Sequence, residues 1–599
     1  HPLDCPICDQ GGECDLQDQA MGYGHDGSRF EENKRAVENK HMGPLISTVM
    51  TRCIHCTRCV RFATEVAGVP ELGAIGRGEN VEITTYLEKN LASELSANVI
   101  DLCPVGALTS RPYAFTARPW ELSKTESIDV MDAVGSNIRV DARGSQVMRV
   151  LPRLHEDVNE EWISDKTRYA IDGLRRQRLD QPYLRGANGS LHPASWDDAF
   201  KTMAAKLKKA KSSTIAAIAG DQADAESMFA LKAMMQRLGS VNIDCRQDGA
   251  KIGGSRAGYV FNSTIAGIDD ADALLIIGSN PREEAAVLNA RIRRNWLATN
   301  MPVGVVGADS DLTYDTKHLG DDTAILSAIL DGSNKFSNVL KRAKRPMIII
   351  GMGALSREDG AAVLATARQI AEAYGVVVKG WNGFNVLHNA AARVGGLDLD
   401  FIPGKGGLDI EGMYKAAENK KLDFVWLLGA DEVDIDRLDG AFVVYQGHHG
   451  DKGAHGADVV LPGAAYTEKD GIYVNTEGRV QYSNRAAFPP GEAREDWAII
   501  RAFSGHINKT IGMDSLSEVR EALCEAYPHF AEGDAIANAK WSKFGGRGKM
   551  DATPITNSLD NFHMTCAISR ASETMAECRK ALLDDTVDET AISSTVAAE

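Results

Sequence analysis

The chain of 599 residues has no long hydrophobic run and fewer basic than acidic side chains. No apolar segment approaches the roughly 18 residues that a membrane-spanning helix needs, and residues 347–351 are short enough to form a buried strand. Lysine and arginine number 66 against 83 aspartates and glutamates, so a nucleic-acid backbone is an unfavourable partner. A serine–histidine–aspartate set, a nucleotide-binding fingerprint and a convincing pair of catalytic carboxylates are also missing. These absences direct attention to the cysteines.

Cysteine is scarce in the larger part of the chain. Of the 11 cysteines, only Cys245, Cys524, Cys566 and Cys578 follow residue 103. Their scattered positions argue against a disulfide framework and for a reducing compartment. We expect these four to be small buried hydrophobic residues rather than ligands.

The remaining cysteines form two arrays near the start of the chain. The first array reads His1-x3-Cys5-x2-Cys8-x5-Cys14, and the second reads Cys53-x2-Cys56-x2-Cys59 with Cys103 far downstream. Two sets of four soft ligands fit two cubane clusters, because each cube has four iron corners to hold. The arrays therefore indicate an electron carrier.

Structural zinc is the alternative interpretation, because sites of three cysteines and one histidine are common. Zinc sites, however, usually combine two separate pairs of ligands, whereas three thiolates in one short turn suit three corners of one cube. A bacterial ferredoxin run would place its fourth cysteine where Ala63 stands, so we assign Cys103, followed by Pro104, to the second set. Arg52, Arg58 and Arg61 surround this array and either offset cluster charge or are ordinary surface residues.

The composition divides the chain into four regions. Residues 1–118 are rich in cysteine, glycine and charge, with a helix expected over residues 90–102. Residues 119–175 alternate like strands, with a hairpin around Gly144. From 176 to 535, four apolar strands end at glycine and precede helices, which predicts doubly wound parallel α/β layers; these strands are residues 215–220, 273–278, 347–351 and 423–429. Residues 536–599 form a C-terminal extension whose tail, from about residue 582, we expect to be disordered.

The two arrays and two later segments occur in the order of one known family. Residues 125–136 read TESIDVMDAVGS, and residues 471–479 read GIYVNTEGR. With the arrays, they make the chain resemble the large iron–sulfur subunits of respiratory complex I, NADH:quinone oxidoreductase, known as the 75-kDa subunit in mitochondria. Family members normally begin with a ferredoxin-like 2Fe–2S module, which this sequence lacks, so a binuclear cluster would belong to residues upstream of His1.

This resemblance implies specific cofactors and partners. It implies one 4Fe–4S cluster on His1, Cys5, Cys8 and Cys14, and a second on Cys53, Cys56, Cys59 and Cys103. Electrons would come from a flavin on the NADH-binding subunit and continue through other iron–sulfur subunits toward the quinone site, with no substrate chemistry in this chain. The implied location is the peripheral arm on the inner side of the respiratory membrane, bacterial cytoplasmic or mitochondrial matrix, with membrane association only through partners.

The later regions resemble molybdopterin-dependent oxidoreductases such as formate dehydrogenases. Those enzymes carry a further cluster on a Cys-x2-Cys-x3-Cys-x27-Cys frame, where this chain has Asp129, Asp132, Ser136 and Ser164. Hard oxygen ligands suit a sulfide-bridged iron cube poorly. We therefore predict no cluster at this frame and a lobe kept for packing and subunit contacts.

Molybdenum is not expected either. Cys245 is the only thiol in residues 242–249, and it lies ahead of the expected metal position, which favours a structural role. Residues 278–281 could mark an old phosphate-facing turn. Residues 471–481 are expected to fix a fold-defining loop. Two alternatives remain open at this point: a catalytic molybdenum enzyme of the formate dehydrogenase type, and a scaffold whose iron is structural.

Overall fold

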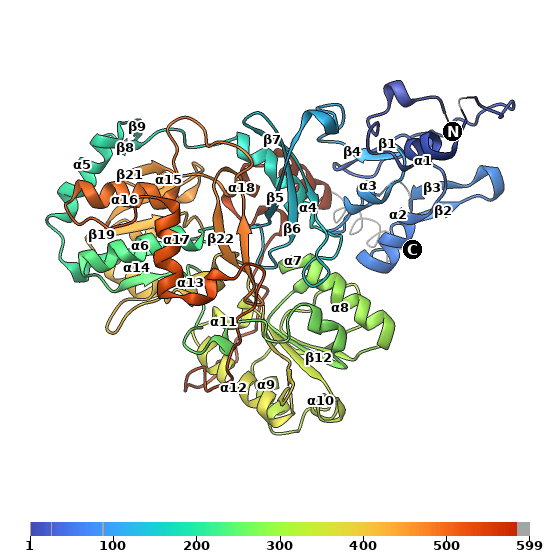
Figure 1. The fold of residues 1–599 in the computed structure, drawn as a ribbon. Helices are drawn as coiled ribbons and strands as arrows, with labels where there is room; N and C mark the ends of the chain where they lie inside the picture. The colour runs from blue at the N-terminus through green and yellow to red at the C-terminus, as the bar shows by residue number, and fades with distance from the viewer. Residues whose placement is uncertain (1, 26, 87–88, 584–599) are drawn as a thin grey trace, which may run out of the picture.

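The computed structural model describes residues 2–25, 27–86 and 89–583 (Figure 1). The N-terminal region is built from short elements, as expected for a segment rich in glycine and cysteine. In its described part, β1 (Ile46–Thr48) pairs with β4 (Leu108–Ser110), and β2 (Leu72–Ile75) pairs with β3 (Glu82–Thr85), both antiparallel. The helices of this region are α1 (Asp15–Tyr23), α2 (Arg58–Arg61) and α3 (Asn98–Leu102), with the π-helix η3 (Phe62–Ala67) after α2.

The helix predicted over residues 90–102 is wrong in its extent, because only its last turn forms. Asp165, from the next region, accepts a hydrogen bond from the backbone N–H of Ala97 at 2.9 Å and from the hydroxyl of Ser96 at 2.6 Å. This carboxylate takes a backbone N–H that a longer helix would use internally, so residues 94–97 form turns ahead of α3. A contact 68 residues away along the chain overrides the local pattern.

The strand-like region is an antiparallel sheet of three strands in the order β5 (Ser123–Ile128), β6 (Asn137–Arg143), β7 (Gln146–Pro152). Gly144 adopts φ +63° in the turn between β6 and β7, so the predicted hairpin is confirmed. α4 (Asp165–Tyr169) and the 3-10 helix η7 (Ala170–Arg175) pack against β7.

The predicted α/β layers are confirmed, and they form two separate sheets within the described ranges. The first has the order β11-β10-β19-β20-β21-β8-β9, parallel except for β8 and β9 at one edge. Its strands are β10 (Ile215–Ala219), β11 (Asn242–Asp244), β19 (Phe424–Leu428), β20 (Phe442–Gly447), β21 (Val459–Pro462), β8 (Tyr183–Arg185) and β9 (Leu191–Pro193). Its helices include α5 (Trp196–Leu207), α6 (Ala225–Leu238), α14 (Ile410–Glu418), α16 (Asp496–His506) and α17 (Leu516–Ala526).

The second sheet is inserted between β11 and β19 and is parallel throughout, in the order β14-β13-β12-β15-β18. Its strands are β12 (Ala273–Ile277), β13 (Val303–Val306), β14 (Lys317–Gly320), β15 (Pro346–Ile350) and β18 (Phe384–Val386). Its helices include α7 (Pro281–Glu284), α8 (Ala286–Thr299), α9 (Ala324–Leu330), α10 (Ser337–Arg342), α11 (Met352–Leu355) and α12 (Gly360–Ala373). β12 and β15 are fully buried, which explains why their apolar runs do not alternate.

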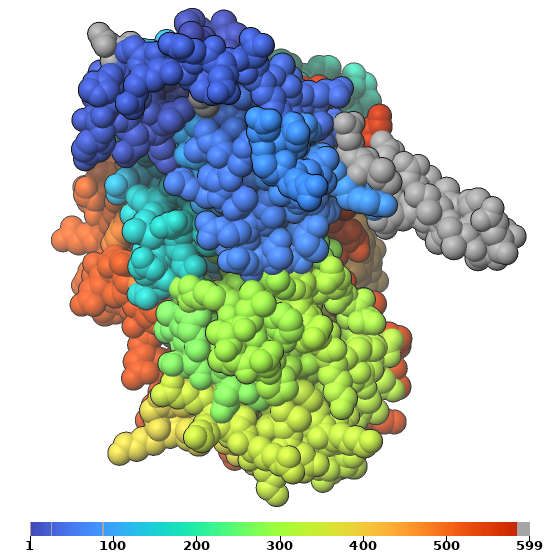
Figure 2. Space-filling view, turned by 90° about the vertical axis from the view of Figure 1, so that its right-hand side faces the viewer, coloured from blue at the N-terminus to red at the C-terminus, as the bar shows by residue number. Residues whose placement is uncertain are grey.

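The four regions pack on one another. Figure 2 shows the N-terminal region in blue above the second α/β layer in green. At this junction, Arg293 donates to the carbonyl oxygens of Thr64 at 2.7 Å and Glu65 at 3.1 Å, and Arg282 pairs with Glu94 at 2.9 Å. The last described part of the chain contacts several regions, and α18 (Ala567–Ala571) packs against η7. The tail that we expect to be disordered lies largely in residues 584–599, outside the described residues.

Of the helices described, none combines the length and apolar character needed to cross a bilayer.

Candidate metal centres

The second cysteine array forms one site. Cys53, Cys56, Cys59 and Cys103 line a single cavity, the first three around α2 and the fourth at the end of α3. Its remaining lining is largely apolar and includes Met50, Ile54, Ile83, Val105, Ala107 and Leu108. The fold thus brings the distant Cys103 to the other three thiols, as the sequence predicts.

The backbone around Cys56 is bent to place these thiols together. His55 and Thr57, on either side of it, both have left-handed conformations, with φ +54° and +60°. Such conformations cost on the order of 1–3 kcal/mol each outside glycine and cluster at functional sites. The bend also directs the backbone N–H of His55 at the Sγ atom of Cys53, 3.4 Å away.

As thiolates, the side chains of this site would need positive charge nearby. Burial raises the pKa of Cys53 and Cys103, and it raises the pKa of Cys59 to about 12, with the neighbouring thiols Cys103 and Cys53 adding to the effect. Thiolates crowded in an apolar cavity are unfavourable unless cations compensate them. Four converging sulfur donors with N–H groups directed at sulfur fit an iron–sulfur cluster.

The first array lies directly against the loop that carries Cys103. Cys14 caps α1, where its Sγ atom accepts from the N–H of Gln17 at 3.4 Å and lies 3.7 Å from the carbonyl oxygen of Pro104. Gly106 packs so closely on Cys8 that an added Cβ would lie 2.2 Å from the sulfur. His1, assigned to the same cluster from the sequence, lies outside the described residues, so the fourth position of this array is not described.

Structural zinc is the alternative occupant of these arrays. Within residues 2–25, 27–86 and 89–583, no three cysteine, histidine, aspartate or glutamate side chains converge closely enough to hold a single metal ion. Structural zinc requires four ligands around one ion at about 2.0–2.3 Å. The four thiols of the second array line one cavity that either occupant would fill.

The degenerate cluster frame is filled with protein groups. The N–H of Asp129 donates to the carbonyl oxygen of Ser136 at 2.8 Å, and its carboxylate accepts from Thr167, whose hydroxyl also bonds that of Ser164 at 2.8 Å. Burial, and then the neighbouring carboxyl of Asp132, raise the pKa of Asp129 to about 8. The frame positions therefore converge as in a cluster site but offer oxygen instead of sulfur.

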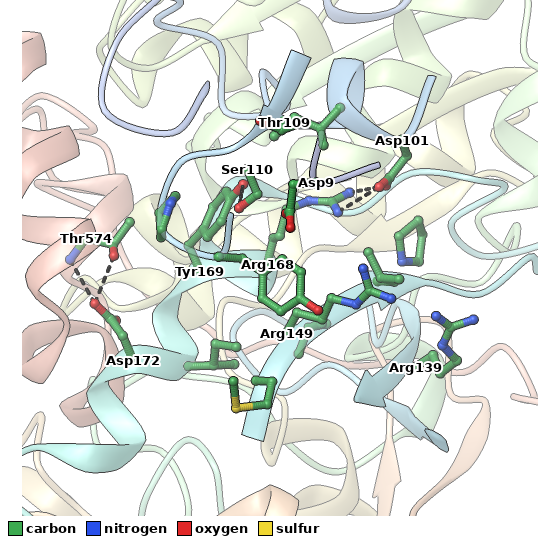
Figure 3. A pocket seen from close by; sticks show the side chains of 18 of the residues that line it. Asp9, Asp101, Thr109, Ser110, Arg139, Arg149, Arg168, Tyr169, Asp172 and Thr574 are labelled. Carbon is green, nitrogen blue, oxygen red and sulfur yellow. Dashed lines mark hydrogen bonds and ion pairs between the residues drawn. The ribbon is translucent and has the colours of Figure 1, made fainter. Parts of the chain in front are cut away.

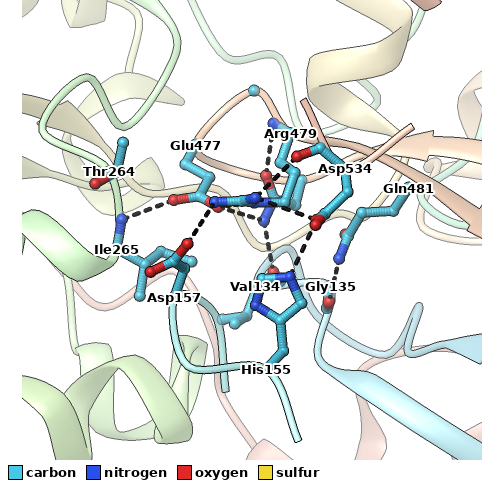
Figure 4. Close-up of polar contacts among 12 residues, drawn as sticks. Val134, Gly135, His155, Asp157, Thr264, Ile265, Glu477, Arg479, Gln481 and Asp534 are labelled. Atoms are coloured by element: carbon cyan, nitrogen blue, oxygen red, sulfur yellow. Dashed lines mark hydrogen bonds and ion pairs between the residues drawn. The ribbon is translucent and has the colours of Figure 1, made fainter. Parts of the chain in front are cut away.

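Residues 471–481 join this frame to the α/β layers (Figure 4). Asn475 donates to the carbonyl oxygen of Val134 at 3.0 Å, and Gln481 donates to that of Gly135 at 2.8 Å. The buried Glu477 accepts from the N–H of Ile265 at 2.8 Å. These contacts join the β-sheet region to the α/β region, which agrees with the fold-defining role expected for this segment.

The turn after β12, which the sequence suggests as a former phosphate site, is filled by the chain itself. The carboxylate of Glu284 accepts from the hydroxyl of Ser279, the N–H of Asn280 at 3.2 Å and the hydroxyl of Ser558 at 2.6 Å. Ile555 lies against Gly278, where an added Cβ would be 2.9 Å from its side chain. A buried carboxylate thus takes the donors that a phosphate would use. No local pattern predicts this contact, because Ser558 is 274 residues away from Glu284.

A pocket of about 440 Å³ lies beside the first array (Figure 3). Its lining includes Asp9 and Glu13, from the loop between Cys8 and Cys14, together with Arg149, Arg168 and Tyr169. Arg149 pairs with Glu13 and also with the buried Asp141 at 2.9 Å, and Arg168 pairs with Asp101. The two arginines are thus paired within the chain, whereas Asp9 Oδ1 makes no hydrogen bond and lies 4.0 Å from Arg118. The pocket joins the first array to the β-sheet region. Sequence reasoning missed it because its walls come from three regions.

Cys245 has the structural character that the sequence predicts. Its side chain is buried, and burial is the main cause that raises the pKa of its thiol. Gly396 packs against it, with 2.8 Å between an added Cβ and the sulfur. The other late cysteines, Cys566 and Cys578, are also buried, whereas Cys524 is half-buried.

Models of known families match most of the chain in a consistent order. The iron–sulfur binding region of NADH-ubiquinone oxidoreductase-G matches residues 1–29, and the ferredoxin-like domain of NADH-quinone oxidoreductase subunit 3 matches 43–109. The NDSU1/NuoG-like 4Fe-4S domain matches 122–172, a range in which this chain has no cysteine. Molybdopterin oxidoreductase matches 178–506, and the C-terminal domain of the NADH-ubiquinone oxidoreductase G subunit matches 532–578.

Relatives cover nearly the whole chain. The G subunit of the NADH-quinone oxidoreductase of Rickettsia conorii is 50% identical over 97% of this chain and 85% of its own length. The mitochondrial NADH dehydrogenase (ubiquinone) iron-sulfur protein 1 of Solanum tuberosum is 52% identical over 96% of this chain and 78% of its own length. Acetylene hydratase from Pelobacter acetylenicus superposes with a TM-score of 0.44 and 13% identity, over 64% of this chain and 69% of that one. The chain belongs to the family formed by the G subunits of NADH-quinone oxidoreductases and their mitochondrial iron–sulfur counterparts.

Proposed function

We propose that this chain, an electron-transfer subunit of NADH:quinone oxidoreductase, holds two 4Fe–4S clusters and relays electrons between them. His1, Cys5, Cys8 and Cys14 would hold the first cluster, and Cys53, Cys56, Cys59 and Cys103 the second. The observation that carries the proposal is the contact between Cys14 and Pro104, because it places the first array against the residue that follows the last thiol of the second.

When bound, such clusters supply one-electron oxidation and reduction without forming or breaking a covalent bond to a substrate. The protein's part is then to fix distance, exclude water and tune charge. The apolar side chains of Met50, Ile83 and Leu108 line the second site and exclude water from it. The N–H groups of His55 and Gln17 are directed at sulfur atoms of the two arrays and stabilise negative charge there. No general acid or base is required.

The direction of electron flow completes the proposal. We assign the flavin and NADH-binding subunit as the donor and the iron–sulfur subunits nearer the quinone site as acceptors. The chain would lie in the peripheral arm, on the bacterial cytoplasmic or mitochondrial matrix side, and would reach the membrane only through its partners. A 2Fe–2S cluster belongs to the subunit only if its native chain has an upstream module.

We assign the regions to separate tasks. Residues 1–118 would form the domain with both cluster sites, residues 119–175 a degenerate cluster domain, residues 176–535 the α/β region without active metal, and residues 536–599 an extension. Two features support the absence of molybdenum: Glu284 takes the donors of the turn after β12, and Ile555 packs on Gly278. The rival catalytic molybdenum enzyme predicts molybdenum in the purified complex, which metal analysis detects.

The direct test is Cys56→Ala in the intact complex. We expect the second cluster's electron paramagnetic resonance (EPR) signal to vanish and NADH-to-quinone transfer to stop, while NADH still reduces the flavin. Cys524→Ala is the matched control, because this half-buried thiol lies outside both arrays. Undiminished NADH-to-quinone transfer in Cys56→Ala would refute the assignment. If NADH does not reduce the clusters through the partner subunits, the iron has a structural role instead.

A further inference from the structure

The guanidinium of Arg52 lies between the two cysteine arrays. Arg52 precedes Cys53 and is only 5% exposed. Its Nε atom pairs with Asp4 Oδ2 at 2.9 Å, and its Nη atoms donate to the carbonyl oxygens of Ile7 and Gly106, both at 3.4 Å. Asp4 and Ile7 stand immediately before Cys5 and Cys8 in the chain. One buried cation therefore contacts the loops of both arrays.

Arg58 repeats this arrangement at the surface. It precedes Cys59, and its Nη1 atom lies 3.2 Å from Asp15 Oδ2 and 3.5 Å from the carbonyl oxygen of Leu102. Asp15 follows Cys14, and Leu102 precedes Cys103. The Arg58 side chain is 46% exposed, so solvent and salt screen its charge more than that of Arg52.

Arg61 differs from both. It lies two residues after Cys59 and is exposed, and no hydrogen bond or ion pair of its side chain occurs in the described part of the chain. It therefore provides an arginine of similar sequence position without the bridging contacts.

We propose that Arg52 is a positioning residue that spans both cluster-binding loops, fixes their separation and raises the reduction potential of both clusters. The inference rests on the proposed function and deepens it. A guanidinium suits this task, because its rigid fork of donors can hold several acceptors at once. A positive charge that is removed from water also acts more strongly on nearby negative sulfur than one at the surface. Net charge and hydrogen bonding are the protein's means of setting cluster potentials.

The test is an EPR redox titration of each cluster, with an iron count, on intact complexes that carry single substitutions. Arg52→Gln should make the reduction of both clusters about tenfold less favourable. For a one-electron reduction this equals a fall of about 59 mV in each midpoint potential. Arg61→Gln, the matched loss of charge, should change that equilibrium less than about twofold at either cluster. Arg52→Lys should keep the midpoints closer to the wild type but alter the magnetic interaction between the reduced clusters, because a compact ammonium on a flexible stem lacks the rigid fork that reaches acceptors on both loops.

Asp4→Asn separates charge from mere packing. It removes the carboxylate beside Arg52 and should shift the midpoints upward, opposite to Arg52→Gln. Shifts of the same sign in these two variants, or unchanged midpoints in Arg52→Gln with full iron content, would overturn the inference. If Arg52→Gln does not assemble, Arg52→Lys still decides, because an unaltered magnetic interaction between the clusters in that variant would overturn the positioning role. If the inference about Arg52 fails, the proposed function still holds as long as Cys56→Ala stops electron transfer.

Discussion

Gly106 and Cys8 are in such close contact that no side chain fits between them: a Cβ at Gly106 would lie 2.2 Å from the Cys8 sulfur. Gly106→Ala should therefore displace Cys8 and remove the first cluster while the second remains, because the atoms nearest to the added Cβ belong to Cys8, Gln10 and Arg52 and to no thiol of the second array. The EPR spectrum of the reduced complex reports the two signals separately. Gly73→Ala is the control, because a Cβ there meets no atom within 4 Å. Two intact signals in Gly106→Ala would contradict this packing.

The buried carboxyl of Asp129 should make stability depend on pH. Its pKa is raised from 3.8 to about 8, so the folded state binds this proton more tightly than the unfolded state. The resulting stabilisation is fully present below about pH 4 and is lost as pH rises toward 8. Asp129→Asn should remove this pH dependence. The change in the free energy of unfolding that it removes is a few kcal/mol, since one pKa unit corresponds to about 1.36 kcal/mol.

Denaturant midpoints of the wild type and Asp129→Asn between pH 4 and 8 measure this difference. Asp439→Asn, at an exposed position, should give a profile parallel to that of the wild type. If the stability of Asp129→Asn depends on pH as that of the wild type does, the Asp129 carboxyl has the same pKa in the folded and unfolded states, which would contradict the prediction.

Lys469 should be essential to the first α/β layer. Its Nζ atom lies 2.6 Å from carboxylate oxygens of both Asp224 and Asp496, and all three side chains are buried. Lys469→Met would leave two buried carboxylates without a cation and should lower the free energy of unfolding by about 3–5 kcal/mol. Lys201→Met, which breaks an exposed pair with Asp197, should lower the free energy of unfolding far less, because solvent screens this pair. Equal losses in the two variants, measured by denaturant unfolding, would contradict the role of burial.

The sequence predicts those features of the fold that depend on local pattern. The strand at β12 is recognisable because a fully apolar run ends at Gly278, and the β6–β7 hairpin because Gly144 separates two alternating segments. Cys103 could be assigned to the second array from ligand chemistry alone. These features need no knowledge of distant contacts.

Features that depend on long-range contacts escape such reasoning. The helix before Cys103 is shortened because Asp165 captures the backbone N–H of Ala97. Arg52 and Arg61 look alike beside the second array in the sequence, yet only Arg52 contacts the first array, because residues 4–7 fold onto it. Ser558 reaches Glu284 across 274 residues, which no periodicity reports.

Low-temperature EPR of the reduced protein, combined with its iron content, is the decisive measurement, because together they report cluster type and number. For residues 1–599 we expect two 4Fe–4S signals, about eight irons and no molybdenum per chain. A protein that stays colourless and iron-free after anaerobic reconstitution, or a third cubane at Asp129 and Ser164, would contradict the assignment of two clusters.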